Sequence, residues 1–364
     1  MGKIAYNKNT DFHKTLKNRV DAYFSENDLS RKANAFFYGK VVVILGSLAA
    51  LYAGIYLIHI ESILWYFNWF AFGLVTLIML LNIMHDALHG NISYKNRVNR
   101  SYGIIFKLLG LNDTIWINLH NYQHHHYSNV EGADPDLLDN GFLRLSPYQK
   151  QYFLHRYQHI YASILYSLST IYWVFSKDFK DIRNIKSMHN WRTILDFIFF
   201  KITYLILFLV LPLYYWEMNY TAILLGFLVM HLTFGLISSY FFLSSHIVDE
   251  VDFYEANGQQ VNQSWAEHQL LTTITFGRHR WIHRLLSGGL NYQVEHHLFP
   301  NICHVHYPAI TDIIKDTALE FNLVYHEHPT FRSAVISHLK ALKKIGRMER
   351  PDRVSAMSYK SIAD

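Results

Sequence analysis

The chain has 364 residues, of which 51% are hydrophobic and 17% are charged, and its 33 Lys and Arg against 28 Asp and Glu give a formal net charge of +5. This composition excludes a disordered or nucleic-acid-wrapping protein, and the apolar residues lie in unbroken blocks that are typical of membrane proteins. The single cysteine excludes an internal disulfide, whereas 23 histidines supply many nitrogen ligands and favour metal chemistry.

Four apolar segments, at about residues 41–60, 63–84, 197–216 and 220–248, are each long enough to cross a hydrocarbon core of about 30 Å. They pair into two helical hairpins, and we expect Lys201 to snorkel towards water at the start of the second hairpin. The hairpin tips carry no basic residue, so all Lys and Arg fall at or beyond one membrane face, and the positive-inside rule places both termini in the cytoplasm. The sequence thus predicts an all-α integral membrane protein with four transmembrane helices.

Two further apolar segments are too short to cross a membrane. Residues 160–175 carry no formal charge but fall short of the ~20 residues that a span needs, and residues 102–111 are interrupted by Lys107. We expect both to be interfacial amphipathic helices, with a fifth crossing at 160–175 as the alternative. The expected organisation is a cytosolic N-terminal segment (1–39), a membrane domain (40–325) and a cytosolic C-terminal tail (326–364).

Histidines gather in three short motifs and at the end of the fourth apolar segment. Under the predicted topology all of these positions lie on the cytoplasmic face. They are His85 and His89 in the first motif, His120, His124 and His125 in the second, His296 and His297 in the third, and His246 at the end of the segment. Residues four apart share one face of a helix, so the first pair can reach one metal ion, and the residue after the second pair can serve another.

Eight imidazoles are too many for one ordinary ion and suit two, although imidazole alone does not choose among Fe, Zn, Cu and Ni. Closed structural zinc typically takes four ligands and often several thiolates, of which this chain can supply only one. Two nitrogen-rich ions with open positions instead fit oxygen activation. Other histidines have simpler interpretations. We expect His126, His304 and His306 to be ordinary polar residues, His59 to be interfacial, and His231 to make a structural hydrogen bond within the fourth span.

The motifs resemble the three histidine boxes, HxxxH, HxxxHH and H/QxxHH, of the membrane fatty acid desaturases. The run from Gly288 to Pro300, GGLNYQVEHHLFP, is particularly similar to the front-end type, in which Gln replaces the first His of the third box. Asp134-Pro-Asp136 after the second box and the segment from His246 to Glu250 match bacterial members. The resemblance covers roughly residues 35–325.

The resemblance implies four transmembrane helices under a cytosolic helical cap that holds a di-iron centre, with O2 as co-substrate. The eight histidines named above would be the iron ligands, and His246 is outside the boxes. Gln293 would make a weak or water-mediated contact, and Asn291 could hold a water beside the metal. The outer ring nitrogens of the ligands need hydrogen-bond acceptors, for which the nearby carboxylates are candidates: Asp86, Asp134, Asp136 and Glu295.

Desaturation of an acyl chain releases two electrons, whereas reduction of O2 to two waters takes four, so two must come from elsewhere. Many front-end relatives carry a fused haem domain, but only about 40 residues precede the first span here, without a His-Pro-Gly-Gly motif. We therefore expect an external donor, a ferredoxin or alternatively a free b-type cytochrome. The acyl substrate could be linked to CoA, a carrier protein or a lipid, and we expect the enzyme in a bacterial inner membrane.

Three other functions could also use a histidine-rich membrane protein. A hydroxylase, an acetylenase or another oxygenase could use the same boxes, because diverting the reaction after the first hydrogen abstraction changes only the product. A metal transporter would be expected to bind its ion near the membrane midplane, whereas these motifs follow the spans. A zinc protease would need His-Glu-x-x-His, and Asp86 stands at the Glu position. The sequence therefore favours a desaturase.

Overall fold

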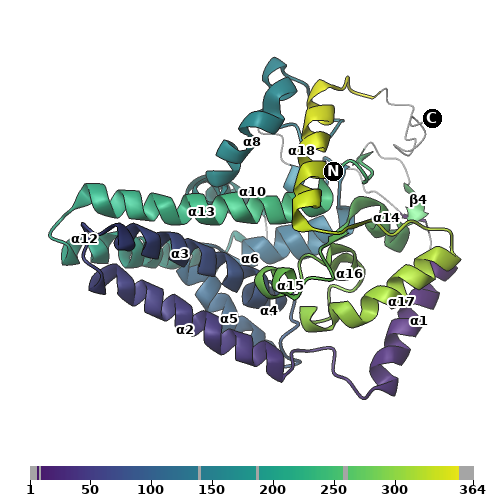
Figure 1. Ribbon diagram of the computed structural model, residues 1–364, viewed down its shortest axis with the longest axis horizontal. Coiled ribbons are helices and arrows are strands. Elements are labelled where there is room, and N and C mark those ends of the chain that lie inside the picture. The colour runs from purple at the N-terminus through teal and green to yellow at the C-terminus, as the bar shows by residue number, and fades with distance from the viewer. Residues whose placement is uncertain (1–5, 8–9, 138–140, 186–187, 257–260, 352–364) are drawn as a thin grey trace. The chain divides into compact units, whose positions relative to one another are not determined.

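The computed structural model describes residues 6–7, 10–137, 141–185, 188–256 and 261–351 (Figure 1). Helices dominate these residues, and their β structure consists of short strands paired two by two. The chain forms two compact units. One, the membrane unit, consists of residues 32–117 and 163–239, and the other, the histidine unit, of residues 1–31, 118–162 and 240–364.

Four helices among the described residues are long and apolar enough to span a membrane, which confirms the predicted fold class. The first is α2 (Ala35–Leu57), and the second runs without a break through α3 (Ile63–Met79), η1 (Leu80–Met84) and α4 (His85–Leu88). The third joins α11 (Trp191–Leu205), η7 (Ile206–Val210) and α12 (Leu211–Tyr215), and the fourth is α13 (Tyr220–His246). Figure 1 shows α2 and α3 packed side by side as the first hairpin.

The first span begins earlier than the hydrophobic segment from which it was predicted. Asn34 caps α2 by accepting a hydrogen bond from the backbone N–H of Phe37. Lys40, which the apolar segment excluded, lies inside the helix and is buried, and its Nζ donates to Asn82 Oδ1 at 2.8 Å. A polar partner on the neighbouring helix thus allows a lysine within the span.

The sequence predicted the surroundings of two polar residues in the membrane unit, and one of the two predictions is confirmed. His231 makes the expected structural hydrogen bonds, with Nδ1 3.0 Å from Thr170 Oγ1 and Nε2 2.6 Å from Tyr204 Oη. The prediction that Lys201 snorkels towards water is wrong. Its buried Nζ donates to the carbonyl oxygens of residues 110 and 174 and to Asp178 Oδ2, at 2.6 to 2.7 Å, so protein groups replace water around the ammonium.

The two short apolar segments are helical, as expected. Residues 102–111 fall largely in α5 (Asn96–Leu108), and residues 160–175 in α8 (Gln158–Ser167), α9 (Ser169–Tyr172) and η5 (Trp173–Lys177), which precede α10 (Asp178–Asn184). Neither segment is among the candidate spans found in the described residues, so a fifth crossing is not supported. Their interfacial position stays a prediction.

The histidine unit has its own hydrophobic core. Phe12 and Leu16 of α1 (Asp11–Glu26) pack with Leu270 of α14 (Trp265–Thr272), Val294 of α16 (Gln293–Leu298) and Ile310 of α17 (Tyr307–Glu320). Three parallel strand pairs tie distant segments together: β1 (Tyr6–Asn7) with β4 (Val261–Ser264), β2 (Val130–Glu131) with β3 (Tyr254–Glu255), and β5 (Thr275–Phe276) with β6 (Glu327–His328). The core thus holds α14 and α16 against each other.

The remaining helices are short, apart from one at the C-terminal end. They are α6 (Asp113–Trp116), η2 (Ile117–His124), α7 (His125–Tyr127), η3 (Pro135–Leu137), η4 (Phe153–Tyr157), α15 (Trp281–Ser287), η8 (His304–His306) and α18 (Phe331–Arg347). The last of these lies in the segment that was expected to be a C-terminal tail, and residues 352–364 of that tail are outside the described residues.

Candidate metal centre

The second histidine motif lies on a π-helix. Asn112 caps α6 by accepting from the backbone N–H of Ile115, and the chain then continues as η2 into α7. His120 and His124 are both buried, with ring centroids 5.2 Å apart, and His125 follows at once. All three imidazoles are therefore presented from one short helical segment.

The third motif begins after a tight turn. Gly289 has a φ of +74°, and a Cβ at this position would lie 2.7 Å from the Cβ of His304, so only glycine fits. The chain then enters α16, in which Gln293, His296 and His297 are all buried. The close approach of residues 289 and 304 fixes where this helix starts and so where its histidines lie.

Three imidazoles from three distant segments meet in the histidine unit. His124, His246 and His297 each offer a ring nitrogen, and these nitrogens lie within 4.8 Å of one another. The ring centroids of the three pairs are 4.7 to 5.0 Å apart. Gln293 joins them, because its Nε2 lies 2.9 Å from His246 Nε2, while its Oε1 is buried without a hydrogen-bond partner among the described residues.

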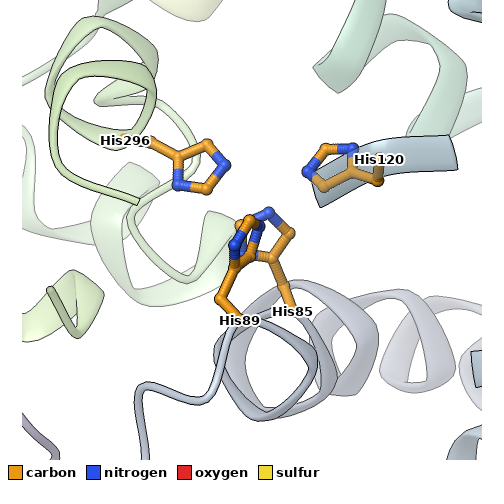
Figure 2. Close-up of side chains that lie close together, drawn as sticks. All are labelled: His85, His89, His120 and His296. Carbon is orange, nitrogen blue, oxygen red and sulfur yellow. The ribbon is translucent and has the colours of Figure 1, made fainter. Parts of the chain in front are cut away.

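A second group of imidazoles adjoins the first in the same unit. His120 Nε2 lies 3.2 Å from His125 Nε2, and the ring of His296 lies 4.4 Å from that of His125 and 6.0 Å from that of His120. Figure 2 shows His120 and His296 pointing towards each other from separate helices. His125 also stacks on His297 at 4.3 Å, so it lies between the two groups.

The first motif belongs to the membrane unit. His85 and His89 lie at the end of the second span with ring centroids 4.6 Å apart and ring planes tilted by 53°, and Figure 2 shows both rising from the same side of the helix. The ring of Trp116 meets each of them edge-on at 5.6 Å. The HxxxH spacing therefore places both imidazoles on one helix face.

Hydrogen bonds at the outer nitrogen orient four of these rings. Nδ1 of His124 lies 3.0 Å from Asp134 Oδ1, and Nδ1 of His297 lies 2.8 Å from Gln269 Oε1. The Nδ1 atoms of His296 and His246 lie 3.1 Å from Tyr307 Oη and 3.3 Å from Ser128 Oγ. When an acceptor takes the Nδ1–H of an imidazole, Nε2 carries the lone pair and becomes the ligand atom.

Asp134 is the predicted acceptor that lies closest to an imidazole. Asp136 Oδ2 is 3.3 Å from the same His124 Nδ1, but the Asp136 side chain is 54% exposed. Burial alone would lower the pKa of His124, yet these two carboxylates outweigh it and raise the pKa to about 9. A metal ion at Nε2 must displace that proton, and the carboxylates then strengthen the imidazole as a donor.

The other predicted supporting residues have different partners. Glu295 accepts from Thr275 Oγ1 at 2.8 Å and from Tyr325 Oη at 2.7 Å, so its carboxylate does not hold an imidazole, and burial raises its pKa. Asn291 donates to the Phe276 carbonyl and accepts from Ser287 Oγ, so both ends of its amide are used within the fold. Asp86 is buried beside His85 in α4, and its backbone carbonyl accepts from the backbone N–H of Asn91 at 2.7 Å.

Histidines outside the motifs have structural partners. His304 and His306 are buried, which differs from the ordinary polar positions expected for them, whereas His59 is exposed. No motif or spacing in the sequence pointed to His268 or His338. Both are buried beside backbone carbonyls, of residues 128 and 247, and burial lowers the pKa of each to about 4.

The donor set fits a transition metal. Two ligand atoms on one ion, with bonds of about 2.1 Å, lie about 3.0 Å apart at a right angle and about 3.4 Å apart at a tetrahedral angle. The 3.2 Å between Nε2 of His120 and Nε2 of His125 lies within this range. The buried Oε1 of Gln293 supplies a further oxygen at the cluster.

The sequence profile of one family, described as fatty acid desaturase, matches residues 62–329. The chain belongs to the fatty acid desaturase family. It is 30% identical to an sn-1 linoleoyl-lipid 6-desaturase of Synechocystis sp., over 95% of this chain and 98% of the relative. A second sn-1 linoleoyl-lipid 6-desaturase, from Arthrospira platensis, is also 30% identical, over 94% of this chain and 95% of its own length. An acyl-lipid (8-3)-desaturase of Physcomitrium patens is 33% identical over 94% of this chain and 73% of the relative.

Membership of this desaturase family agrees with the four apolar helices and the histidine clusters. The chain is therefore an integral membrane enzyme, an oxidoreductase that acts in fatty acid metabolism. Its histidine clusters are able to bind metal ions.

Proposed function

We propose that this desaturase introduces a double bond into the acyl chain of a membrane lipid, using O2 and two electrons from an external donor at a di-iron centre. The observation that carries the proposal is the convergence of imidazoles from η2, α13 and α16 in the histidine unit. A lipid-linked substrate is favoured because the relatives are named as linoleoyl-lipid and acyl-lipid desaturases.

The ligand set that we propose contains the eight histidines of the three boxes and the end of α13. His124, His246 and His297 would hold one iron ion, with Gln293 as a weak or water-mediated partner. His120 and His296 would contribute to the second, and His125 adjoins both groups. His85 and His89 are included because of their spacing and the family resemblance. When bound, the iron ions would supply the activation of O2 and the oxidation of C–H bonds.

The protein's own part in this reaction is to hold and orient the ligands. Asp134 and Gln269 keep the Nδ1–H of His124 and His297 turned outward, so that each Nε2 faces the cluster. The burial of these imidazoles excludes water, which would otherwise compete for reactive species. Removal of two hydrogens from the acyl chain supplies two electrons, and a one-electron carrier, a ferredoxin or a b-type cytochrome, must supply two more.

The proposal is tested by expressing the full chain with an electron donor in a bacterium whose fatty acids are simple. Mass spectrometry should find a new double bond, first in intact glycerolipids and not in acyl-CoA. His297→Ala should abolish the product and lower the iron content of the purified protein, whereas His126→Ala, next to the second box, should change neither. A hydroxylated or acetylenic product would instead identify the related oxygenase, and first appearance in acyl-CoA would contradict the lipid-linked substrate.

The topology is part of the same proposal. From the distribution of basic residues we propose that both termini and the histidine unit lie in the cytoplasm of a bacterial cell, as the positive-inside rule requires. Cysteine substitutions at Lys17 and Glu349, with a membrane-impermeant thiol reagent, test this directly. Both positions should react only after the inner membrane is opened, and reaction in intact spheroplasts would contradict it.

A further inference from the structure

One edge of the histidine unit exposes large apolar side chains in consecutive turns. Phe153, Leu154 and Tyr157 of η4 and Ile160 near the start of α8 are 68%, 66%, 47% and 68% exposed. Such residues are normally buried in a folded protein, and a contiguous set on the surface marks a contact with another apolar phase. Arg156 lies among them and is also exposed.

A basic stripe runs along the neighbouring helix. Lys340, Lys343 and Arg347 are exposed on α18, with the spacing of three and four residues that places them on one face. Of the other cations at this end of the chain, Lys344 pairs with Asp249 at 2.8 Å and Arg350 with Glu255. Asp249 and Glu255 therefore pair with cations outside the stripe.

The apolar edge and the basic stripe are built into one surface. Gln158 Nε2 donates to the Leu342 carbonyl at 2.7 Å, and Gln151 Nε2 donates to the Gly346 carbonyl at 2.8 Å. A Cβ at Gly346 would overlap the carbonyl oxygen of His155, so α18 crosses η4 in direct backbone contact. Figure 1 shows α18 beside the start of α8.

The cations of α18 also affect a titratable group on the apolar side of this contact. The pKa of His159 lies below its ordinary value, because of burial and then because Lys343 and Arg347 disfavour a further positive charge. The cations of α18 therefore lie beside η4 and α8, at the border of the exposed apolar residues.

We propose that this surface, formed by residues 153–160 and the exposed face of α18, rests on the headgroup region of a bilayer and prefers anionic lipid. Aromatic and aliphatic side chains next to Lys and Arg are the pattern of interfacial membrane segments, in which the apolar groups enter the acyl boundary and the cations meet headgroup phosphates. The enzyme is itself held in a bilayer by its spans, so this partner is always present. An acidic protein would match the cations but would offer no fluid apolar phase to four protruding side chains.

The test uses the full chain in lipid nanodiscs, with a nitroxide label at Phe153→Cys. The native Cys303 is fully buried, so it should not take the label. Power-saturation measurements compare collisions with O2, which concentrates in lipid, and with a water-soluble nickel chelate. In discs that contain phosphatidylglycerol, we expect the label at 153 to favour O2, and a label at the exposed Lys17 of α1 to favour nickel.

The anionic preference has its own comparison. Replacing phosphatidylglycerol by phosphatidylcholine, or introducing Lys343→Glu with Arg347→Glu, should shift the label at 153 towards the nickel reagent. Each cation lost should lower the inserted fraction relative to the exposed fraction by roughly fivefold. Lys14→Glu with Lys17→Glu makes the same change of net charge on α1 and should have no effect.

Two results would overturn the proposal. One is a label at 153 that meets nickel as freely as the label at 17 in anionic discs, and the other is a label shielded from both reagents, which would mean that a protein covers the surface. An O2 preference that ignores both lipid charge and the α18 substitutions would reject the anionic preference. The lipid titration of the otherwise unchanged chain gives an answer even if the charge-reversed variant fails to fold.

Discussion

Replacement of Asp134 by Asn tests how the histidine centre is held. The Oδ1 of Asp134 is 3.0 Å from His124 Nδ1 and accepts from the backbone N–H of Asp136, while its Oδ2 accepts from the backbone N–H of Asn129, both at 2.9 Å. Asn keeps the size of the side chain, but it removes the negative charge and turns an amide NH2 towards one of these donors. His124 then loses the ionised acceptor that fixes its ring and strengthens its Nε2 as a ligand.

The size of the effect follows from burial. Loss of an acceptor of this kind typically weakens metal binding by about 10- to 100-fold, or about 1.4 to 2.7 kcal/mol. We expect the upper part of this range, because the Asp134 side chain is 1% exposed and its charge is poorly screened. Asp136→Asn is the matched control. Its carboxylate is 54% exposed and 3.3 Å away, so the loss should be no more than about fivefold.

The assay is competition for ferrous iron between the purified protein and a coloured chelator. The melting temperature of the metal-free protein, measured in parallel, separates a loss of binding from a loss of folding. Equal weakening by the two substitutions, or unchanged iron binding in a folded Asp134→Asn protein, would refute the role assigned to Asp134.

Three further predictions concern the stability of the fold. Lys201→Met leaves the buried Asp178 without its cation and should destabilise the membrane unit by about 3–5 kcal/mol, and thermal unfolding in detergent should show partial recovery when Asp178→Asn is added. Burial favours the neutral form of Glu250, but its hydrogen bonds to a histidine and a serine outweigh this and lower its pKa from 4.5 to about 2. Its contribution to stability should therefore be complete above about pH 4.5 and be lost as the pH falls towards 2, and Glu250→Gln should flatten the melting temperature over that interval. Gly289→Ala combines a positive φ with a steric overlap, whereas at Gly141, which has the same φ of +74°, an added Cβ would meet no atom of the described residues within 4 Å. Gly289→Ala should therefore lower the melting temperature further, and Gly141→Ala should report the backbone strain of roughly 1–3 kcal/mol alone.

The spans could be predicted because length and hydrophobicity are local properties of a sequence. Their ends could not, because a cap or a buried partner decides them. Asn34 starts α2 before the apolar block begins, and Asn82, on another helix, accepts from Lys40 and so keeps a lysine inside the span. Lys201 was misjudged for the same reason, since the groups that satisfy its ammonium come from segments far away in the chain.

In the histidine centre, too, local sequence patterns were predictable and contacts with distant residues were not. Box spacing indicated which segments carry the imidazoles, and the Asp-Pro-Asp motif pointed to Asp134. The spacing did not indicate how the imidazoles group, because His120 joins His296, whereas His124 lies with His246 and His297. Gln269 and Ser128 could not be foreseen, because they are 28 and 118 residues from the histidines that they orient and no periodic pattern connects them. Glu295 stands next to a box histidine but turns to Thr275, because neighbours in a helix point in different directions.

The central claim is that iron held by these imidazoles drives the oxidation of a lipid acyl chain. It is tested most directly by measuring iron content and desaturation together, on the purified full chain in nanodiscs with O2 and a one-electron donor. The account predicts two iron ions per chain, a new double bond in the lipid, and loss of both in the His124→Ala protein. Desaturation that persists after iron has been removed, or in a folded His124→Ala protein, would contradict it.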